Sequence, residues 1–233
     1  MNRIDSALFS LSFSLFTFAA SAATVYVARN GTGDGSSWAN AKGFAVAIAG
    51  AQAGDELRLK AETYPLATGG VTAGYVIAAG ITLKGGYTGD DAAPDARADG
   101  AYTVFDGETT APADNAILIC TAANGTLSLE RIELRRAFKR AVHADKGASV
   151  ALDTCRIIDN GYSTSSGHFS GRGIYAKGTA GATFTARNCA FEGNIIGART
   201  AAGSDTGNGN DSGAALYLNT VDKAVIDDTL FAT

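Results

Sequence analysis

The eleven-residue stretch Val150-Ala-Leu-Asp-Thr-Cys-Arg-Ile-Ile-Asp-Asn160 is repeated in pattern by Phe184-Thr-Ala-Arg-Asn-Cys-Ala-Phe-Glu-Gly-Asn194 in this chain of 233 residues. In both copies two apolar residues lie five positions apart, a Cys precedes the second of them by two positions, and an Asn follows it by three. The apolar pair recurs without the Cys at Leu129/Leu134 and at Ile226/Phe231. Such recurrence indicates a repeat protein, in which each copy forms one structural unit.

A second pattern, an apolar residue beside a larger one, alternates with the first. It occurs at Ile119-Cys120, Val142-His143, Ile174-Tyr175 and Leu216-Tyr217. The step from it to the next apolar pair is nearly constant, at 10, 10, 12 and 10 residues, whereas the return steps are 8, 17 and 25 residues. In a stacked coil the core-facing part of each turn must keep its register, while outward loops can lengthen freely. The spacing therefore predicts an all-β fold, a single-stranded right-handed parallel β-helix.

Stacking assigns structural roles to the two full copies. Neighbouring strands lie ~4.8 Å apart, so equivalent residues in successive turns lie over one another. We expect bends at Asp153-Thr154 and Arg187-Asn188, and an amide ladder at a corner that joins Asn160 to Asn194. The side chains expected to point into the core are Val150, Leu152, Cys155 and Ile157 in one turn and Phe184, Ala186, Cys189 and Phe191 in the next.

The N-terminus has the features of an export signal. Arg3 precedes an apolar run from Ala7 to Ala20, and Ala20-Ser21-Ala22 matches the small-x-small site of signal peptidase. The alternative, an uncleaved transmembrane anchor, needs ~20 predominantly apolar residues, more than this run provides. The sequence therefore predicts a signal peptide over 1–22 and a mature chain without a transmembrane helix.

Residues 23–54 are expected to cap the coil, which then occupies 55–233. Thr24–Val27 is β-prone, and a short helix is expected after the turn-rich segment that follows it. Strand and helix together would shield the backbone groups that an open coil end exposes. The residues assigned to the helix are Ser37 as N-cap, Phe44, Val46 and Ile48 on its apolar face, and Gly54 as its end.

The charge balance argues against a nucleic-acid ligand. The chain has 19 Lys and Arg against 23 Asp and Glu, a formal net charge of −4, so no basic excess is available to neutralise phosphates. A hydrophobic content of 46% supports an ordered protein rather than a disordered one.

The later repeats resemble those of the polymorphic outer membrane protein family, which alternate Phe-x-x-Asn with Gly-Gly-Ala-Ile/Leu. The matching segments are Cys189-x-Phe191-x-x-Asn194 and Ser212-Gly-Ala-Ala-Leu216. The N-terminal half is similar to bacterial secreted β-helix proteins through Asp34–Trp38, Gly54–Leu57, Leu83–Asp90, Arg97 and Thr103–Gly107. The resemblance implies an exported or surface-bound coil and implies no activity, because the repeat describes a coil and not a reaction.

The last apolar pair closes just before Thr233, without the cap, membrane barrel or attachment domain that this family would supply. A bare terminal turn is an aggregation liability, so we expect a coil that is incomplete at its C-terminus. The competing interpretation is a short free-standing coil that associates end to end with a second copy.

Two of the three Cys residues occupy equivalent positions. Stacking would bring the Cα atoms of Cys155 and Cys189 to ~5 Å, inside the range that a disulfide tolerates. We favour reduced, inward-packed thiols over a bridge, and we assign Cys120 to the position of His143 in its turn. A zinc site is not expected, because neither His143 nor His168 lies near a Cys pair at a known ligand spacing.

An outward strip is the main candidate for ligand binding. Adjacent aromatic and hydrogen-bonding groups can hold sugar rings by stacking and polar contact. The alternative is an ordinary exposed ladder with an Asp145–Lys177 pair worth ~0.2–1 kcal/mol. His143 could act as a general base, although the sequence places no partner to orient it. The strip consists of Cys120, His143, Tyr175 and Tyr217, with Asp145, Lys177 and Asn219 two residues farther along.

Two acidic segments are candidates for a hard cation such as Ca²⁺. The loop 205–211 offers oxygen ligands at alternating positions but lacks the bidentate Glu of strong sites. We expect the second segment to be solvated, and no other cofactor is expected. The oxygen-bearing residues are Asp205, Asn208, Asn210 and Asp211 in the loop, and Asp90, Asp91, Asp95 and Asp99 in the second segment.

Two functions remain open. We favour a non-catalytic, adhesin-like or structural module, secreted or on the bacterial cell surface or outer membrane, that binds a carbohydrate polymer or a cell-surface partner. The alternative is a polysaccharide lyase or glycoside hydrolase, since pectin-active enzymes use the same pectate-lyase-like solenoid. A hydrolase of this kind needs a close carboxylate pair. The repeats show no cluster of carboxylates on one outward strip, which favours binding.

Overall fold

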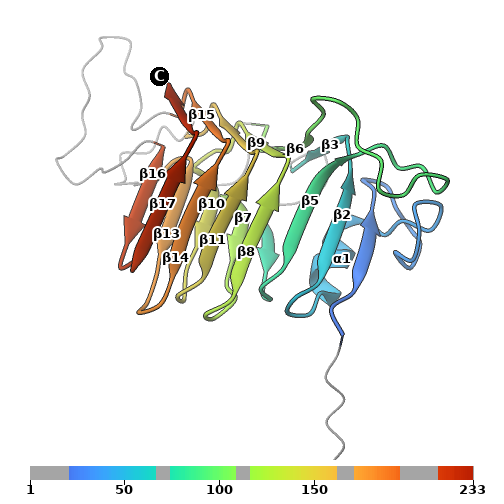
Figure 1. Ribbon diagram of the computed structural model, residues 1–233, viewed down its shortest axis with the longest axis horizontal. Helices are drawn as coiled ribbons and strands as arrows, with labels where there is room; N and C mark the ends of the chain where they lie inside the picture. Colours follow the sequence, from blue (N-terminus) through green and yellow to red (C-terminus); the bar gives the residue numbers. More distant parts are fainter. Residues whose placement is uncertain (1–20, 67–73, 109–115, 162–170, 195–214, 233) are drawn as a thin grey trace, which may run out of the picture.

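The computed structural model describes residues 21–66, 74–108, 116–161, 171–194 and 215–232, and it confirms the predicted parallel β-helix (Figure 1). This part of the chain contains eighteen strands and one helix. The strands form three sheets in which every pairing between named strands is parallel.

Each sheet collects one strand from successive turns. Sheet A has the order β1 (Thr24–Val27), β2 (Glu56–Lys60), β5 (Thr82–Tyr87), β8 (Thr126–Glu130), β11 (Ser149–Asp153), β14 (Thr183–Arg187) and β17 (Lys223–Asp227). Sheet B contains β3 (Thr63–Pro65), β6 (Thr103–Asp106), β9 (Ile132–Arg135), β12 (Arg156–Ile158), β15 (Ala190–Glu192) and β18 (Leu230–Ala232). Sheet C contains β4 (Tyr75–Ile77), β7 (Ala116–Cys120), β10 (Arg140–Ala144), β13 (Ile174–Lys177) and β16 (Leu216–Asn219).

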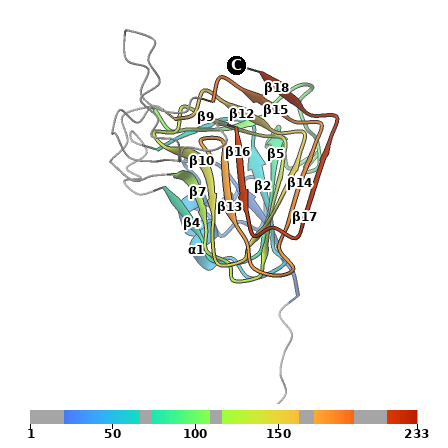
Figure 2. The same cartoon turned by 90° about the vertical axis from the view of Figure 1, so that its left-hand side faces the viewer.

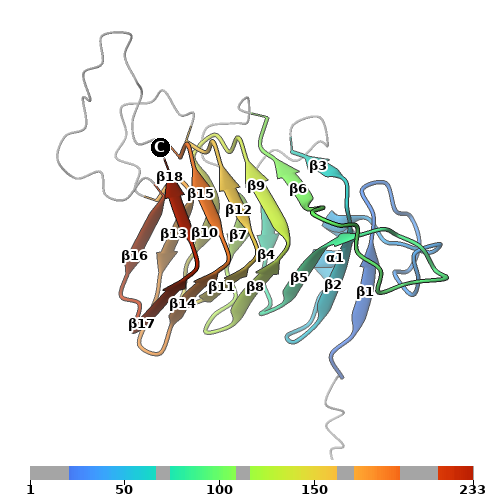
Figure 3. The same ribbon diagram turned by 45° about the horizontal axis from the view of Figure 1, so that its top comes forward.

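The chain passes from sheet C to sheet A to sheet B in each turn, as in β10, β11 and β12. Figure 2 looks toward the C-terminal end and shows the three sheets enclosing a central core. Figure 3 shows the turns stacked along the long axis of the molecule. The fold is thus a right-handed parallel β-helix, and its outward surfaces are three flat faces with a period of one strand per turn.

The predicted inward residues form the core. All eight are buried, the most accessible being Cys189 at 4%. Val150 is paired in register with Phe184, and Ile157 with Phe191, so each apolar side chain packs on its counterpart in the next turn. Burial of a large apolar side chain contributes ~1.5–3 kcal/mol, which makes these stacks the main stabilising element of the coil.

The bends between sheets A and B repeat one backbone conformation in four consecutive turns. Arg131, Thr154, Asn188 and Asp228 have φ angles of 51°, 53°, 51° and 42°. This left-handed conformation costs a non-glycine residue roughly 1–2 kcal/mol. It is held by hydrogen bonds between turns, since the N–H groups of the first three donate to carbonyl oxygens of the next turn at 3.1, 2.9 and 3.2 Å. The bends lie where the repeat predicted them.

The predicted amide ladder is present at the corner that follows sheet B. Asn160 is fully buried, and its Nδ2 donates to Oδ1 of Asn194 at 2.9 Å and to the carbonyl of Leu134 at 3.1 Å. Its Oδ1 accepts the N–H of Ala137 at 2.9 Å, while Nδ2 of Asn194 donates to the carbonyl of Ile157 at 2.8 Å. The ladder therefore satisfies backbone groups of two successive turns and links them to the side chain of Asn194 in a third.

Strand β1 and helix α1 (Phe44–Gly50) lie at the first turn of the coil. Strand β1 pairs with the edge of β2. Phe44 packs its ring against Tyr64, Tyr75 and Phe105, with centroid distances of 5.9, 4.7 and 4.7 Å. The helix thus closes the apolar interior at this end with an aromatic cluster.

Three details of the predicted helix are wrong. Its N-cap is Gly43, which makes no side-chain capping bond, and its last residue is Gly50 rather than a residue next to Gly54. Val46 is 65% exposed, whereas Phe44 and Ile48 are buried. The buried residues Phe44, Ala47 and Ile48 follow the i, i+3, i+4 spacing of one helix face, and Val46, two positions from Phe44 and from Ile48, lies on the opposite face.

Ser37 does not cap this helix because its segment is held by another part of the chain. The carboxylate of Asp91 accepts the N–H groups of Trp38 at 2.7 Å and Ala39 at 2.8 Å. Ser37 accepts instead the N–H of Asn40 at 3.2 Å. A contact with a residue more than fifty positions away thus overrides a local capping preference.

At the other end of the coil, Ile226, Leu230 and Phe231 are 46, 56 and 45% exposed. The predicted signal peptide falls almost entirely within 1–20, outside the described residues, so its boundary stays a prediction. Within the described ranges, no helix has the length and apolar character needed to cross a membrane.

Asp106 provides a test of the electrostatics of sheet B. Burial alone would raise the pKa of its carboxyl group, but hydrogen bonds from Arg136, the Glu108 amide and Arg135 lower that pKa below its ordinary value. A lowered folded-state pKa stabilises the fold above the unfolded pKa, and this contribution is lost as pH falls through the folded value.

We expect the free energy of unfolding to decrease as the pH falls below about 4, because the Asp106 carboxylate is then protonated. In urea titrations over this range, Asp106→Asn should show a shallower pH dependence, and an unchanged slope would contradict this assignment.

Candidate functional site

Sheet C carries the predicted row of aromatic side chains. His143 on β10, Tyr175 on β13 and Tyr217 on β16 are paired in register. The ring centroids of His143 and Tyr175 lie 5.0 Å apart at an interplanar angle of 86°, and those of Tyr175 and Tyr217 lie 5.1 Å apart at 8°. All three side chains are half-buried. We call these three residues the aromatic row.

The assignment of Cys120 to this row is wrong. His143 is in register with Ile119, whereas Cys120 is in register with Ala144 and is fully buried. Ile119 in turn pairs with Val76 of β4, which is 49% exposed. The row therefore continues toward the N-terminus with aliphatic side chains, and Cys120 belongs to the core.

The stacked tyrosines turn their edges, rather than their faces, outward. Their centroid separation matches the strand spacing of ~4.8 Å, so the ring faces are directed toward neighbouring turns. The guanidinium carbon of Arg140 lies 4.3 Å from the ring centroid of Tyr175. The guanidinium group therefore covers part of one face of that ring. A ligand on this face would consequently be held more by the phenol hydroxyls and polar neighbours than by stacking.

The pKa of His143 is lowered from its ordinary value by burial and by the positive charge of Arg140, against a smaller opposing effect of Asp145. The imidazole is therefore neutral at neutral pH and can donate one hydrogen bond and accept another. Among the described residues no side chain hydrogen-bonds to it. The arrangement suits a contact residue better than an oriented general base.

Of the polar residues beyond the row, Lys177 and Asn219 are in register, whereas Asp145 follows the end of β10. Lys177 lies opposite Asn219, whose Nδ2 donates to the hydroxyl of Tyr217 at 3.1 Å. Asp145 accepts the N–H of Lys146 at 2.9 Å. In the part of the chain that the structure describes, no ion pair joins Asp145 to Lys177.

The calcium candidate at 205–211 lies outside the described residues. In the other acidic segment, Asp91 holds the Trp38 loop, Asp90 accepts the N–H of Ala92, and Asp95 pairs with Arg58. No group of three or more His, Cys, Asp and Glu within the described ranges is arranged to hold a metal ion.

Cys155 and Cys189 are free and buried, in agreement with the preference for reduced thiols over a bridge. The Cys155 sulfur donates to the Leu129 carbonyl at 3.4 Å, and the Cys189 sulfur donates to the Arg187 carbonyl at 3.0 Å. Burial raises the pKa of the Cys155 thiol well above its ordinary value, which keeps it protonated. This position is structural rather than reactive.

Sheet A assembles a row of charged side chains that the sequence analysis did not identify. We call it the charged row. Four of its members directly follow an apolar residue of the repeated pair, so the repeat contained the signal that would have found them. In register from β2 to β17 the members are Arg58, Lys84, Glu130, Asp153, Arg187 and Asp227.

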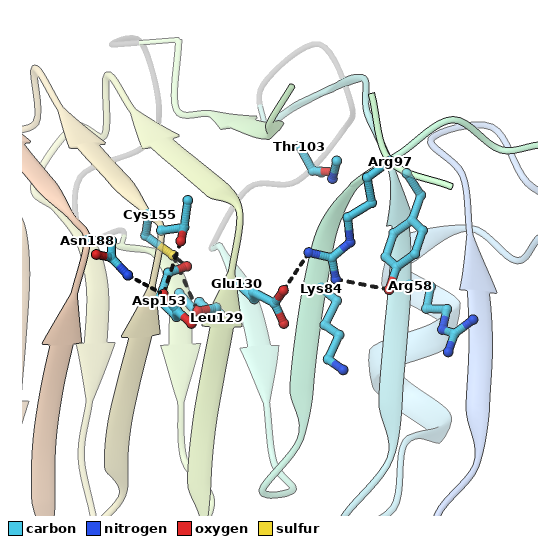
Figure 4. Close-up of polar contacts among 12 residues, drawn as sticks. Arg58, Lys84, Arg97, Thr103, Leu129, Glu130, Asp153, Cys155 and Asn188 are labelled. Atoms are coloured by element: carbon cyan, nitrogen blue, oxygen red, sulfur yellow. Dashed lines mark hydrogen bonds and ion pairs between the residues drawn. The ribbon is translucent and has the colours of Figure 1, made fainter. Parts of the chain in front are cut away.

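Most charges near the N-terminal end of this row are neutralised locally. Figure 4 shows the side chain of Arg97 between two partners. Arg97 forms an ion pair with Glu130 and donates a hydrogen bond to the hydroxyl of Tyr87. Lys84 pairs with Glu56 at 2.6 Å. Asp153 accepts Nδ2 of Asn188 at 3.3 Å (Figure 4). The row thus contains charges of both signs rather than a uniform charge.

The sequence analysis found no cluster of carboxylates on one outward strip, and the register adds two that are neighbours. Glu130 on β8 lies directly beside Asp153 on β11. Arg187 on β14 follows on the other side of Asp153, and Asp227 lies beyond it. Two neighbouring carboxylates and a guanidinium therefore face outward on adjacent turns.

Comparison with known proteins gives one distant structural neighbour. No family model matches the chain, and no curated protein matches its sequence. Among solved structures the chain is similar to the crystal structure of pectate lyase Pel9A, with a TM-score of 0.43 and 14% sequence identity over 90% of this chain. The match spans 63% of that longer chain.

Proposed function

We propose that this chain is an exported, non-catalytic β-helix of the bacterial surface or extracellular space that binds a carbohydrate polymer. The export signal predicted over 1–22 supports the location. The resemblance of the repeats to polymorphic outer membrane proteins supports an adhesin-like or structural role.

The observation that carries the proposal is the aromatic row of sheet C. It provides one hydrogen-bonding aromatic group on each of three successive turns, with centroids 5.0 and 5.1 Å apart. Asn219, hydrogen-bonded to Tyr217, adds an amide beside it. Evenly spaced polar groups on a rigid face suit a ligand that itself repeats, since each contact is pre-organised at little entropic cost.

The aromatic row can be tested by removing its two stacked rings. In affinity electrophoresis through gels containing soluble plant or bacterial polysaccharides, we expect the double variant Tyr175→Ala/Tyr217→Ala to lose about tenfold in affinity, or about 1.4 kcal/mol. The matched control is Tyr102→Ala, a half-buried tyrosine whose ring contacts Arg156 instead. Equal retention of the double variant and wild type would contradict a ligand site on sheet C.

A polysaccharide lyase or glycoside hydrolase is the second candidate. One observation favours it, the neighbouring outward carboxylates Glu130 and Asp153. Glycosidases work with two carboxyl groups that flank the scissile bond, ~5–9.5 Å apart. Glu130 is engaged in an ion pair with Arg97, whereas Asp153 accepts a hydrogen bond from the side chain of Asn188.

A further inference from the structure

We propose that a groove on the outer face of sheet A, separate from the aromatic row, binds a neutral linear polysaccharide. This proposal rests on the proposed function, because it names a second site and a chemical class for the carbohydrate polymer. Two surface hollows carry it, one of about 560 Å³ at the corner between sheets C and A and one of about 200 Å³ on sheet A. Both are lined by Thr82 and Ser128, so the two hollows adjoin, and we call them together the groove.

The corner hollow exists because successive turns place very small residues there. Its lining includes Ala78, Ala79 and Gly80 from one turn and Ala122, Ala123 and Gly125 from the next. A Cβ atom on Gly80 would lie 2.9 Å from the Thr126 nitrogen and 3.2 Å from the Gly125 Cα atom. The two backbones therefore pack together at a distance that no side chain allows, and the surface above them is left hollow.

The floor of the groove on sheet A is a row of small side chains, one per turn. Thr82, Ser128, Ala151 and Thr185 are in register on β5, β8, β11 and β14. Their spacing is that of the strands, ~4.8 Å. One sugar unit of a linear β-1,4-linked glycan advances by a similar length, whereas one residue of an extended peptide advances by only ~3.3 Å. The floor thus matches a glycan in period and offers hydroxyl groups to it.

The wall of the groove is formed by Glu130, Asp153 and Arg187 of the charged row. Glu130 is neutralised by Arg97. Asp153 and Arg187 are opposite in charge and adjacent in register, and within the described residues the Arg187 guanidinium forms no ion pair. The wall therefore has no net charge to attract a polyanion or a polycation. Its carboxylates and guanidinium can still accept from and donate to sugar hydroxyls.

The test is calorimetric titration of the full mature chain with cellohexaose, xylohexaose and mannohexaose, and with a hexamer of galacturonate for comparison. We expect binding of at least one neutral hexamer, with an affinity that changes less than about twofold between about 0.05 and 0.5 M salt. Ala151→Gln would place a long side chain on the groove floor and lower that affinity about tenfold. Its matched control is Val225→Gln, in the same row on β17 but outside the hollow.

A second pair of variants changes hydrogen bonding without changing size. Asp153→Asn should weaken binding severalfold, whereas Asp227→Asn, in the same charged row but outside the hollow, should leave it unchanged. Preference for the galacturonate hexamer with steep salt dependence would overturn the proposal. Binding that survives Ala151→Gln but is lost in Tyr175→Ala/Tyr217→Ala would overturn it and leave the proposed function intact. No binding of any polymer would overturn both.

Discussion

Phe105→Ala is expected to lower the free energy of unfolding by about 3–5 kcal/mol, the range for removing a fully buried aromatic ring. Phe105 has no exposed surface. Its ring packs against Phe44 of the capping helix at 4.7 Å, against Tyr64 at 5.1 Å and against Tyr75 at 5.8 Å. Truncation would leave a cavity between the cap and the first turns of the coil, where neighbouring turns can relax only on one side.

Chemical denaturation followed by circular dichroism measures this effect. The control is Phe231→Ala, the same substitution on β18, where the side chain is 45% exposed and stacks on Phe191 at 4.9 Å. We expect that control to lose about 1 kcal/mol, since part of its apolar surface is already in water. Equal losses for the two variants would show that the aromatic cluster does not anchor the cap.

The second large effect is expected at Asn160. Asn160→Ala removes the acceptor of the Ala137 N–H and the donor to the Leu134 carbonyl, both inside the coil. Each buried polar group left without a partner costs about 1–3 kcal/mol, so the two together should cost about 2–6 kcal/mol. Loss of the bond to Asn194 would also loosen the following turn. Hydrogen exchange should then speed up in β12 and β15 before it does in β5.

A matched control is Asn219→Ala on the outer face of sheet C. Asn219 is half-buried and bonds only to side chains, the hydroxyls of Tyr217 and Thr220, in the contacts described. Water can replace both bonds, so the change should cost less than about 1 kcal/mol. A loss at Asn160 no larger than at Asn219 would contradict the structural role of the ladder.

The fold was predictable where the repeat contains both patterns. From Val150 to Asn194 the alternation of inward and outward residues, the bends and the Asn ladder all follow from one register. The prediction fails at Cys120, because every residue from Ala116 to Cys120 is apolar and no alternation marks the inward face. A one-residue error in register moves a side chain to the other face of a strand.

Contacts between distant turns explain what the sequence could not reveal. The Asp91 carboxylate that holds the Trp38 loop, and the Arg97 side chain that neutralises Glu130, come from a segment whose position local preferences do not determine. The charged row was in principle accessible from the repeat. It was missed because the carboxylates of separate turns, Glu130 and Asp153, were not aligned with each other.

Binding without cleavage is the central functional claim, and one measurement tests it most directly. The mature chain is incubated with polygalacturonate and with alginate, with and without Ca²⁺, and unsaturated product is followed by ultraviolet absorbance, while the same samples and the neutral hexamers are analysed for shortened chains. The account predicts that neutral polysaccharide is retained by the protein and that no substrate is shortened. Robust turnover that depends on Ca²⁺, or that is abolished by Asp153→Asn, would contradict it and establish the enzyme instead.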